Sequence, residues 1–499
     1  MPKDSAINAS DAVVVTAPFS PFDSGPPAGP AVLRGAAAAR GLNLRCIDLN
    51  IRYLLSFGAD QLGPATVFVG DHAKNQHRVS AARRHFVEAC PLPQLEAGSI
   101  PCCLHPTFCL PHNFDAIAVT VRKMEEDRFW VKFGEGHLFG PVPAPAVLGL
   151  SIMGPAQVLA SCLIASLARR YWPGTLIVAG GSHITLLATK IARDAAYGQF
   201  FDLFLPGHCE HTFAELVARV ARKDGSRCPS GLMTAGEGMP ELHELPPAEW
   251  PAPLFDRAEL SLYSRQYISL PLQISRGCAY GRCRMCTYPA VEAYRRTTSG
   301  EYLRRVIGAT ADFGVGRFSF KDSLVDARTL RAVAEVTRGL PVPVHWSATT
   351  KLSASMDEAM MRQLYAAGCR TLEVGVETIH SRLQALAGKT QNRLMMEKAI
   401  EAILKAGIGV VVNLIYGFPS ETVDEARDQL AWYLELRTRF PELLMGSHNM
   451  LEINFGSRFA QVPRDFGLEL GPLGPWAFSY PWNAPSWRGS FAERLANAG

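Results

Sequence analysis

Short runs of β-branched and apolar residues alternate with helical patterns from Asp11 to about Arg222. A strand followed by a helix, repeated several times, is typical of a parallel sheet covered by helices. We therefore predict an α/β fold that begins with a doubly wound, Rossmann-like parallel-sheet domain over residues 1–230. The runs expected to form its strands are AVVVTAP, LRCIDLN, DAIAVTV (Asp115–Val121), VLGLSIMG (Val147–Gly154), TLIVAGGSH (Thr175–His183) and FDLFLPGH (Phe201–His208).

The pattern changes after this first domain. Pro, Glu and Gly are frequent over residues 231–268, which is linker composition. A second strand-and-helix series then covers 269–440 and predicts a full or partial (β/α) barrel, with its site at the carboxyl ends of the strands. Residues 441–499 lose this periodicity and gain aromatics. This C-terminal extension is either a surface segment packed by its own aromatics or a substrate lid.

Gly136–Ala168 carries no formal charge and is long enough to span a membrane as a helix of about 20 residues. Several prolines and glycines interrupt it, so we predict a buried strand followed by a buried helix. The N-terminal sequence MPKDSAINASDAVVV has no signal-peptide pattern, and we expect a cytoplasmic protein with no membrane partner.

Charge and cysteine content exclude further classes of protein. The chain has 50 Lys and Arg against 46 Asp and Glu, and neither sign forms a long run. We therefore expect no nucleic-acid partner. The 12 cysteines do not form the dense framework of a disulfide-stabilised domain, so reduced thiols and metal ligation are expected.

The segment SRGCAYGRCRMCTYP places Cys278, Cys283 and Cys286 in a C-x4-C-x2-C pattern directly after a predicted strand. Thiolates are the ligands of iron-sulfur clusters. Three of them leave one iron of a four-iron cluster open to a small chelating molecule. A zinc site is an alternative, although it normally needs four protein ligands and there is no second C-x2-C. Unrelated buried cysteines are the other alternative.

Cys102, Cys103, His105 and Cys109 form a second group of potential ligands. Their spacing does not repeat a known ligand spacing, so buried or surface thiols are the default interpretation.

The cysteine segment resembles the signature of the radical SAM superfamily, C-x3-C-x-Φ-C, in which Φ is apolar or aromatic. Met285 fits Φ, and the first interval is one residue longer than in the signature. GVET (375–378), Lys389 and IYGFPSET (415–422) follow at suitable distances and strengthen the resemblance. It implies a [4Fe-4S] cluster on the three cysteines and S-adenosylmethionine (SAM) on Met285, Asp322, Lys351, Gly375, Glu377 and Tyr416.

Three of these SAM contacts have specific roles by resemblance. Glu377 would accept hydrogen bonds from the ribose hydroxyls, Lys351 would lie near the SAM carboxylate, and Asp322 would bind its amino group. The residues alone allow other interpretations: a helix-start glutamate, a solvated lysine and a helix N-cap aspartate.

The first domain resembles the cobalamin-binding domain that precedes the barrel in cobalamin-dependent radical SAM enzymes. The matching text is GPPAGPAVLRGAAAARG, GLSIMGPAQVL, IVAGGSHIT and LPGHCEHTF. A corrin is a broad plate and requires small residues at strand ends. Nucleotide binding is the alternative, but G-x-G-x-x-G is missing after the first strand. The implied cobalamin contacts are Ser151, Gln157, Gly180, Gly181, Ser182, His183, Gly207, His208 and Thr212.

The D-x-H-x-x-G pattern that supplies a histidine to cobalt is missing. The resemblance therefore implies that the lower face of cobalamin meets the PFSPFDSGPPAG loop or another non-histidine group. His183 and His208 are expected at the periphery of the cofactor.

By resemblance, the predicted function is a cobalamin-dependent radical SAM methyltransferase, with no catalytic residue assigned beyond the cluster ligands. It would transfer a methyl group from SAM via methylcobalamin to an unactivated carbon of a small molecule or peptide in natural-product biosynthesis. A flavodoxin or ferredoxin would supply electrons. The alternatives are radical cyclisation or rearrangement without methylation, non-radical methyl transfer as in tryptophan 2-methyltransferase, and a cofactor-binding sensor without turnover.

Overall fold

The computed structural model describes residues 11–19, 25–56, 111–222, 229–242, 244–263, 268–296, 300–311 and 314–484. The chain folds into two compact units. Unit 1 comprises Met1–Ile268 and Gly474–Phe478, and unit 2 comprises Ser269–Leu473 and Ser479–Gly499.

Unit 1 contains a five-stranded sheet with the strand order β2-β1-β3-β4-β5, in which every pair is parallel. Every residue of β1 and β3 is buried, as a strand covered on both faces requires. The strand order reverses between β1 and β3, and in such sheets this crevice receives the ligand. The strands are β1 (Ala12–Thr16), β2 (Leu44–Asp48), β3 (Val147–Ser151), β4 (Leu176–Gly180) and β5 (Leu203–Leu205).

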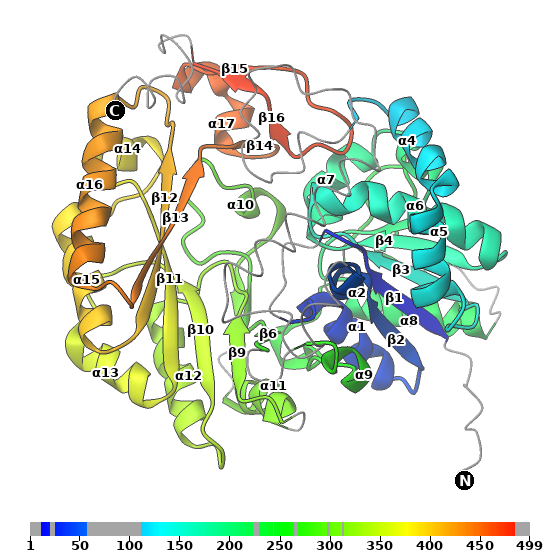
Figure 1. The fold of residues 1–499 in the computed structure, drawn as a ribbon, viewed down its shortest axis with the longest axis horizontal. Helices are drawn as coiled ribbons and strands as arrows, with labels where there is room; N and C mark the ends of the chain where they lie inside the picture. Colours follow the sequence, from blue (N-terminus) through cyan, green and yellow to red (C-terminus); the bar gives the residue numbers. More distant parts are fainter. Residues whose placement is uncertain are drawn as a thin grey trace. The chain divides into compact units, whose positions relative to one another are not determined.

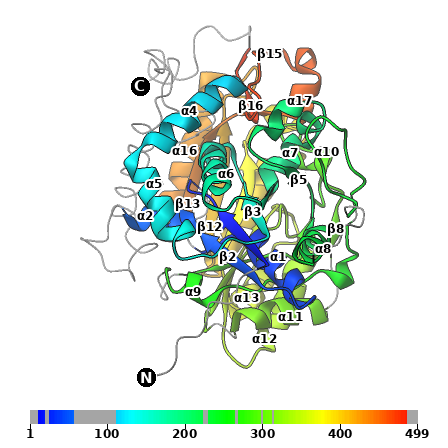
Figure 2. The ribbon, with the colours of Figure 1, turned by 90° about the vertical axis from the view of Figure 1, so that its right-hand side faces the viewer.

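Helices cover both faces of this sheet (Figure 2). Helices α1 and α8 contact each other on one face, and α4 contacts α6 on the other. This arrangement confirms the predicted doubly wound parallel sheet. The helices are α1 (Ala28–Ala38), α2 (Leu49–Ser56), α4 (Phe114–Glu126), α5 (Arg128–Gly134), α6 (Val158–Tyr171), α7 (Ser182–Ile191) and α8 (Glu210–Ala221), with the short helices η3 (Glu135–Phe139), η4 (Pro155–Gln157) and η5 (Ala195–Gln199).

The prediction of a strand at Asp115–Val121 is wrong, because this segment begins α4. Asn113 caps the helix by accepting a hydrogen bond from the Ala116 amide at 2.8 Å. The buried side chains of Ile117, Val121 and Met124 recur every three to four residues, which is a helical and not a strand period. The β-branched composition of the run concealed this period.

The uncharged stretch behaves as predicted: it forms the buried strand β3 and the largely buried helix α6. Among the described residues, no helix is both long and apolar enough to cross a membrane.

The described residues of the 231–268 segment pack on unit 1. Met233 forms an antiparallel bridge with Phe204, and Trp250 is buried. Helix α9 (Arg257–Leu260) contributes Glu259, whose carboxylate accepts hydrogen bonds from the Asp48 amide at 2.8 Å and from the Arg52 guanidinium at 2.5 and 2.7 Å. The Glu259–Arg52 ion pair and the Glu259–Asp48 hydrogen bond therefore connect the 231–268 segment to the end of β2 and the start of α2.

Unit 2 contains a six-stranded, all-parallel sheet with the order β13-β12-β11-β10-β9-β6. Buried and partly exposed residues alternate along β10, β11 and β12, so one face is packed and the other is open. Six strands make this a partial barrel, within the predicted class. The strands are β6 (Leu270–Leu272), β9 (Arg317–Phe320), β10 (His345–Thr350), β11 (Cys369–Glu377), β12 (Gly409–Tyr416) and β13 (Leu444–Met450).

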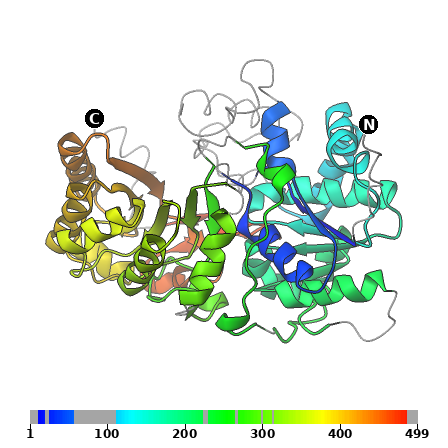
Figure 3. The same cartoon turned by 90° about the horizontal axis from the view of Figure 1, so that it is seen from below.

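The long helices of unit 2 lie on one side of its sheet (Figure 1, Figure 3). They contact the strands through the buried set of side chains, so the other face is the inner face of the partial barrel. The main helices are α11 (Gly300–Ala311), α12 (Ala327–Arg338), α13 (Glu358–Ala366), α14 (Ser381–Leu386), α15 (Arg393–Lys405) and α16 (Val423–Arg439).

The C-terminal extension adds short elements to unit 2. In the hydrophobic core of these elements, Leu451, Phe459 and Leu468 pack together with Leu383 and Phe418. Residues 474–478 are instead part of unit 1, where Trp476 is buried. The elements are β14 (Ile453–Asn454), α17 (Arg458–Gln461), η7 (Pro463–Phe466), β15 (Glu469–Leu470), β16 (Ser479–Tyr480) and β17 (Trp482–Asn483), paired as β14-β16 and β15-β17.

We predict that Glu259→Ala lowers the free energy of unfolding of unit 1 by about 3–5 kcal/mol, because it leaves the largely buried Arg52 guanidinium without its partner. Urea unfolding followed by tryptophan fluorescence measures the change. Arg362→Ala is the matched control, since it breaks an exposed pair with Glu358 and should cost about 0.5 kcal/mol or less. Equal effects of the two variants would contradict the structural role of Glu259.

Candidate functional site

The three cysteines lie in a loop closed at its base by a short antiparallel ladder. Strand β7 (Ser275–Arg276) pairs with β8 (Arg295–Arg296), and the intervening residues contain only one helical turn, α10 (Tyr288–Val291). The loop follows β6 directly, at the carboxyl end of the sheet. This is the edge at which the predicted barrel would carry its site.

Cys278, Cys283 and Cys286 are free thiols, and all three are partly exposed. Burial raises the pKa of Cys283 to about 11 and also raises the pKa of Cys286. Cys278 adds to both shifts by its charge, so the three thiols are close enough to interact electrostatically. Within the described ranges, no set of three His, Cys, Asp or Glu side chains has the geometry to bind a metal ion as it stands.

The cysteine loop is docked on the turn that follows α14. The Arg284 amide donates to the Ala387 carbonyl at 2.9 Å, and Phe459 donates its amide to the Arg284 carbonyl at 3.1 Å. Gly388 has φ +75°, and a Cβ there would collide with the Arg282 carbonyl oxygen. Only glycine permits this approach, so the turn and the loop fit through a bare backbone contact.

Asp322 fixes the start of this loop. One carboxylate oxygen accepts hydrogen bonds from the Ile274 amide at 3.0 Å, the Ser275 hydroxyl at 2.7 Å and the Ser275 amide. The other oxygen is buried and has no hydrogen-bond partner among the described residues. Burial raises the pKa of Asp322 to about 6. The N-cap of α12 is Asp326, so the N-cap interpretation of Asp322 is wrong.

Glu377 ends β11 and forms an ion pair with Lys389 at 2.7 Å. Lys389 also donates to the Gly375 carbonyl at 2.7 Å, and a side chain at Gly375 would collide with the Glu377 carboxylate. Glu377 has φ +63°, an uncommon backbone conformation for this residue type that concentrates at functional sites. Its electrostatic influence on Cys283 and Cys286 places the pair beside the thiols. Helix α14 begins only at Ser381, so Glu377 is no helix-start residue.

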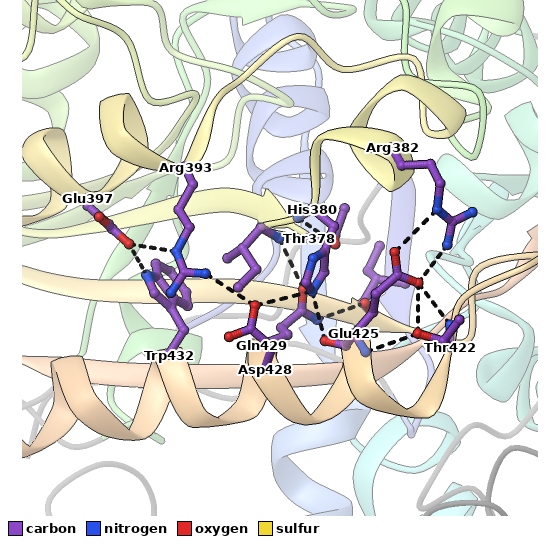
Figure 4. Close-up of polar contacts among 12 residues, drawn as sticks. Thr378, His380, Arg382, Arg393, Glu397, Thr422, Glu425, Asp428, Gln429 and Trp432 are labelled. Atoms are coloured by element: carbon purple, nitrogen blue, oxygen red, sulfur yellow. Dashed lines mark hydrogen bonds and ion pairs between the residues drawn. The ribbon is translucent and has the colours of Figure 1, made fainter.

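The segment after Glu377 is tied to the start of α16 (Figure 4). Gln429 accepts a hydrogen bond from the Ile379 amide at 3.2 Å, and the His380 ring bonds the Glu425 carbonyl at 2.8 Å. Thr422 and Glu425 form a capping box that fixes where α16 begins. Helix α16 therefore contacts the residues directly after GVET, and its capping box includes Thr422, the last residue of GFPSET.

The other predicted SAM residues occupy different surroundings. Met285 packs against the core of the C-terminal extension. Lys351 follows β10, with its ammonium 3.7 Å from the centroid of the Tyr280 ring, and burial followed by the charge of Lys389 lowers its pKa. Tyr416 belongs to the buried, helix-facing set of β12, where its hydroxyl bonds His448 at 3.1 Å. Its hydroxyl therefore lies on the face opposite the inner one.

Sequence reasoning missed polar residues on the inner face. Glu373 of β11 accepts a hydrogen bond from the Asn413 amide group at 2.7 Å. It is the direct ladder partner of Thr349 in β10. Ser347 and Ser319 bond each other on the same face at 2.9 Å. The sequence could have identified them, because these residues alternate with apolar ones along their strands. Only the apolar positions of that alternation were used to predict the strands.

In unit 1, Gln157 joins the two loops at the switch point of the sheet. Its side chain is fully buried, accepts from the Met153 amide at 2.8 Å and donates to the Ala17 carbonyl at 2.8 Å. Ser151, which ends β3, is also buried. Ser182 donates to the Met153 carbonyl at 2.9 Å. These predicted cobalamin contacts therefore set the loop conformation at the strand ends.

Gly180 and Gly181 end β4 at the same edge. Gly181 has φ +105°, and a Cβ there would lie 2.5 Å from the Ile152 carbonyl oxygen. Gly207 follows β5 and donates its amide to the Thr185 hydroxyl at 2.9 Å. Thr212 is buried on α8 and bonds the Ser230 carbonyl at 3.3 Å.

The two predicted histidines differ in their surroundings. His183 is buried, and its ring bonds the Trp476 carbonyl at 3.0 Å; burial lowers the pKa of His183 to about 4. His208 lies 3.9 Å from the Glu210 carboxylate and is largely buried. The second cysteine group, residues 102–109, and part of the PFSPFDSGPPAG loop lie outside the described residues.

Comparison with known proteins supports these features. Residues 272–432 match the family model of the radical SAM superfamily. No curated protein sequence matches the chain. The chain is similar in structure to the radical S-adenosylmethionine methyltransferase TsrM from Kitasatospora setae with cobalamin and [4Fe-4S] cluster bound, at 15% identity and TM-score 0.61, over 94% of this chain and 84% of that chain.

Two further structures show the same likeness. TsrM with tryptophan substrate and the SAM analog aza-SAM bound gives 16% identity and TM-score 0.58, over 93% of this chain and 80% of that chain. The cobalamin-dependent S-adenosylmethionine radical enzyme OxsB with aqua-cobalamin bound gives 13% identity and TM-score 0.62, over 95% of this chain and 64% of that chain. The chain therefore carries a radical SAM domain in residues 272–432, within a fold that it shares with cobalamin-dependent radical SAM enzymes.

Proposed function

We propose that this protein is a cobalamin-dependent radical SAM methyltransferase that transfers a methyl group from SAM to an unactivated carbon of a small molecule or peptide. One observation carries the proposal: three free thiols lie beside the Glu377–Lys389 pair at the carboxyl end of a parallel six-stranded sheet.

The donor set fits a four-iron cluster with one open iron. Three thiols on one loop supply three ligands, and the partial exposure of each leaves room for an inorganic core. The raised pKa values of Cys283 and Cys286 mean that cluster binding must displace protons from them. Lys389 and Lys351, both close enough to influence Cys283, offset part of the negative charge of a thiolate-bound cluster.

The fit to cobalamin rests on unit 1. Its strand order gives an edge at the carboxyl ends of β1 and β3, where a flat ligand can lie across the loops. A Cβ at Gly154 would meet no atom within 4 Å, so this loop presents bare backbone to open space. His183 already bonds Trp476, which favours a non-histidine group below cobalt. The solved neighbours with cobalamin bound support this assignment.

Together, these cofactors supply reductive cleavage of SAM and a methyl group carried by cobalt. The chain's own residues bind and orient. The Glu377 carboxylate would accept hydrogen bonds from the ribose diol, and its ion pair with Lys389 fixes the direction of that carboxylate. Asp322 fixes the loop that carries the thiols. The inner-face Glu373 and Asn413 offer polar contacts for a substrate, and an external flavodoxin or ferredoxin would supply electrons.

The proposal is tested by metal content. We expect about four iron and one cobalt per chain after anaerobic reconstitution with iron, sulfide and hydroxocobalamin, followed by desalting. Iron without cobalt would remove cobalamin from the proposal, and cobalt without iron would contradict the cluster. With reductant and substrate, radical methylation should yield both S-adenosylhomocysteine and 5′-deoxyadenosine. Methylated product with S-adenosylhomocysteine alone would instead indicate non-radical transfer.

We predict that replacing Cys278, Cys283 and Cys286 together by Ala reduces bound iron to background and abolishes reductive SAM cleavage, because no thiolates remain for the cluster. Cys369→Ala is the control, since this buried thiol lies at the other end of β11 and its loss should leave the iron content unchanged. Iron retained at the wild-type level in the triple variant would disprove these ligands.

A further inference from the structure

The interval between the first two cysteines contains Ala279, Tyr280, Gly281 and Arg282, one residue more than the radical SAM signature. An added residue in a ligand loop must either bulge outward or form contacts of its own. Tyr280 forms such contacts, because its side chain is partly buried and bonded at both its hydroxyl and its ring.

The hydroxyl and the ring of Tyr280 reach two different strand-end segments. The hydroxyl donates to the Gly388 carbonyl at 2.8 Å, in the turn directly before Lys389. The Lys351 ammonium, directly after β10, lies over the ring at 3.7 Å from its centroid. A cation over the face of a tyrosine ring is attracted by its quadrupole. Tyr280 therefore connects Lys351 to the turn on which the cysteine loop is docked.

The Lys351 ammonium has an unusual set of charged neighbours. Two further cations, Lys389 and Arg282, are close enough to act on it electrostatically. Lys389 is already paired with Glu377. No carboxylate in the described part of the chain forms an ion pair with Lys351, whose one strong contact is the Tyr280 ring. A partly buried ammonium in this position favours an anionic group of a bound molecule.

We propose that Tyr280 is a positioning residue that holds the Lys351 ammonium beside the cysteine loop, where it receives the carboxylate of SAM. This inference rests on the proposed function, because it requires SAM at the cysteine loop. It gives the longer cysteine interval a specific role in SAM binding. A purely structural role for Tyr280 would stabilise the loop without distinguishing one part of SAM from another.

The test compares SAM with decarboxylated SAM, which lacks only the group that Lys351 would bind. Full-length Tyr280→Leu, Tyr280→Phe, Lys351→Gln, the Tyr280→Leu/Lys351→Gln double variant and the Tyr280→Phe/Lys351→Gln variant are reconstituted with iron and sulfide. Iron per chain and the Kd of each ligand are measured without reductant, so that no turnover occurs. Tyr365→Leu is the matched control, because it removes a ring from another cation, Arg370, at the far end of β11.

We expect Tyr280→Leu and Lys351→Gln each to weaken SAM binding about tenfold, and the double variant to weaken it no further, because both changes remove one shared contact. The Kd of decarboxylated SAM and the iron content should not change. Tyr280→Phe keeps the ring and should lose less affinity. Tyr365→Leu should bind both ligands like the wild type.

Three results would overturn the inference: unchanged SAM affinity in Tyr280→Leu with full iron, equal weakening of both ligands, or additive losses in the double variant. If Tyr280→Leu binds no iron, Tyr280→Phe replaces it in the test. The loss of SAM affinity that Tyr280→Phe causes must then disappear when Lys351 is already Gln, and a loss that persists there would overturn the inference. A wild-type protein without iron or SAM binding would contradict the proposed function itself.

Discussion

The positions of the three thiols depend on hydrogen bonds that reach the cysteine loop from other strands. The loop has only a two-residue ladder and one helical turn of its own, so it lacks the regular backbone pairing that fixes a helix or sheet. Asp322, at the end of β9, satisfies the amides that precede the loop. The turn at Ala387 and Gly388 supports its middle. The positions of the thiols therefore depend on the end of β9 and on the turn after α14.

Side-chain hydrogen bonds also fix the loops at the strand ends of unit 1. Gln157, Ser182 and His183 look like ligand-binding residues, yet each has its main polar group bonded within the protein. A buried amide or imidazole without a partner costs free energy, and loops that leave a parallel sheet expose many such groups. These side chains satisfy the loop backbone, so bare peptide groups and small residues such as Gly154 are left to face a ligand.

Much of the fold was predictable, because both sheets are parallel and their buried strands read as apolar runs between turns. The strand predicted at Asp115–Val121 failed because β-branched residues there follow a helical period that becomes visible only with Met124 and the Asn113 cap. The cysteines, Glu377 and Asp322 could be singled out as candidates from the sequence because each follows or ends a predicted strand. The contact between Tyr280 and Gly388 joins residues 108 apart in the chain, and such a contact is not encoded by spacing along the chain. The ion pair between Lys389 and Glu377 spans only 12 residues, but it forms only when the turn after α14 brings Lys389 back to the end of β11.

The longer cysteine interval shows how a residue added to a ligand loop can be accommodated. A residue added to a tight loop shifts its neighbours unless its side chain and backbone find partners elsewhere. Here the turn after α14 supplies both: Gly388 accepts the Tyr280 hydroxyl and, having no side chain, admits the Arg282 carbonyl. Gly388 directly precedes Lys389, the partner of Glu377. The backbone contact that accommodates the extra residue thus lies one residue from the ion pair that fixes the end of β11, so the cysteine loop and this strand end are positioned by the same turn.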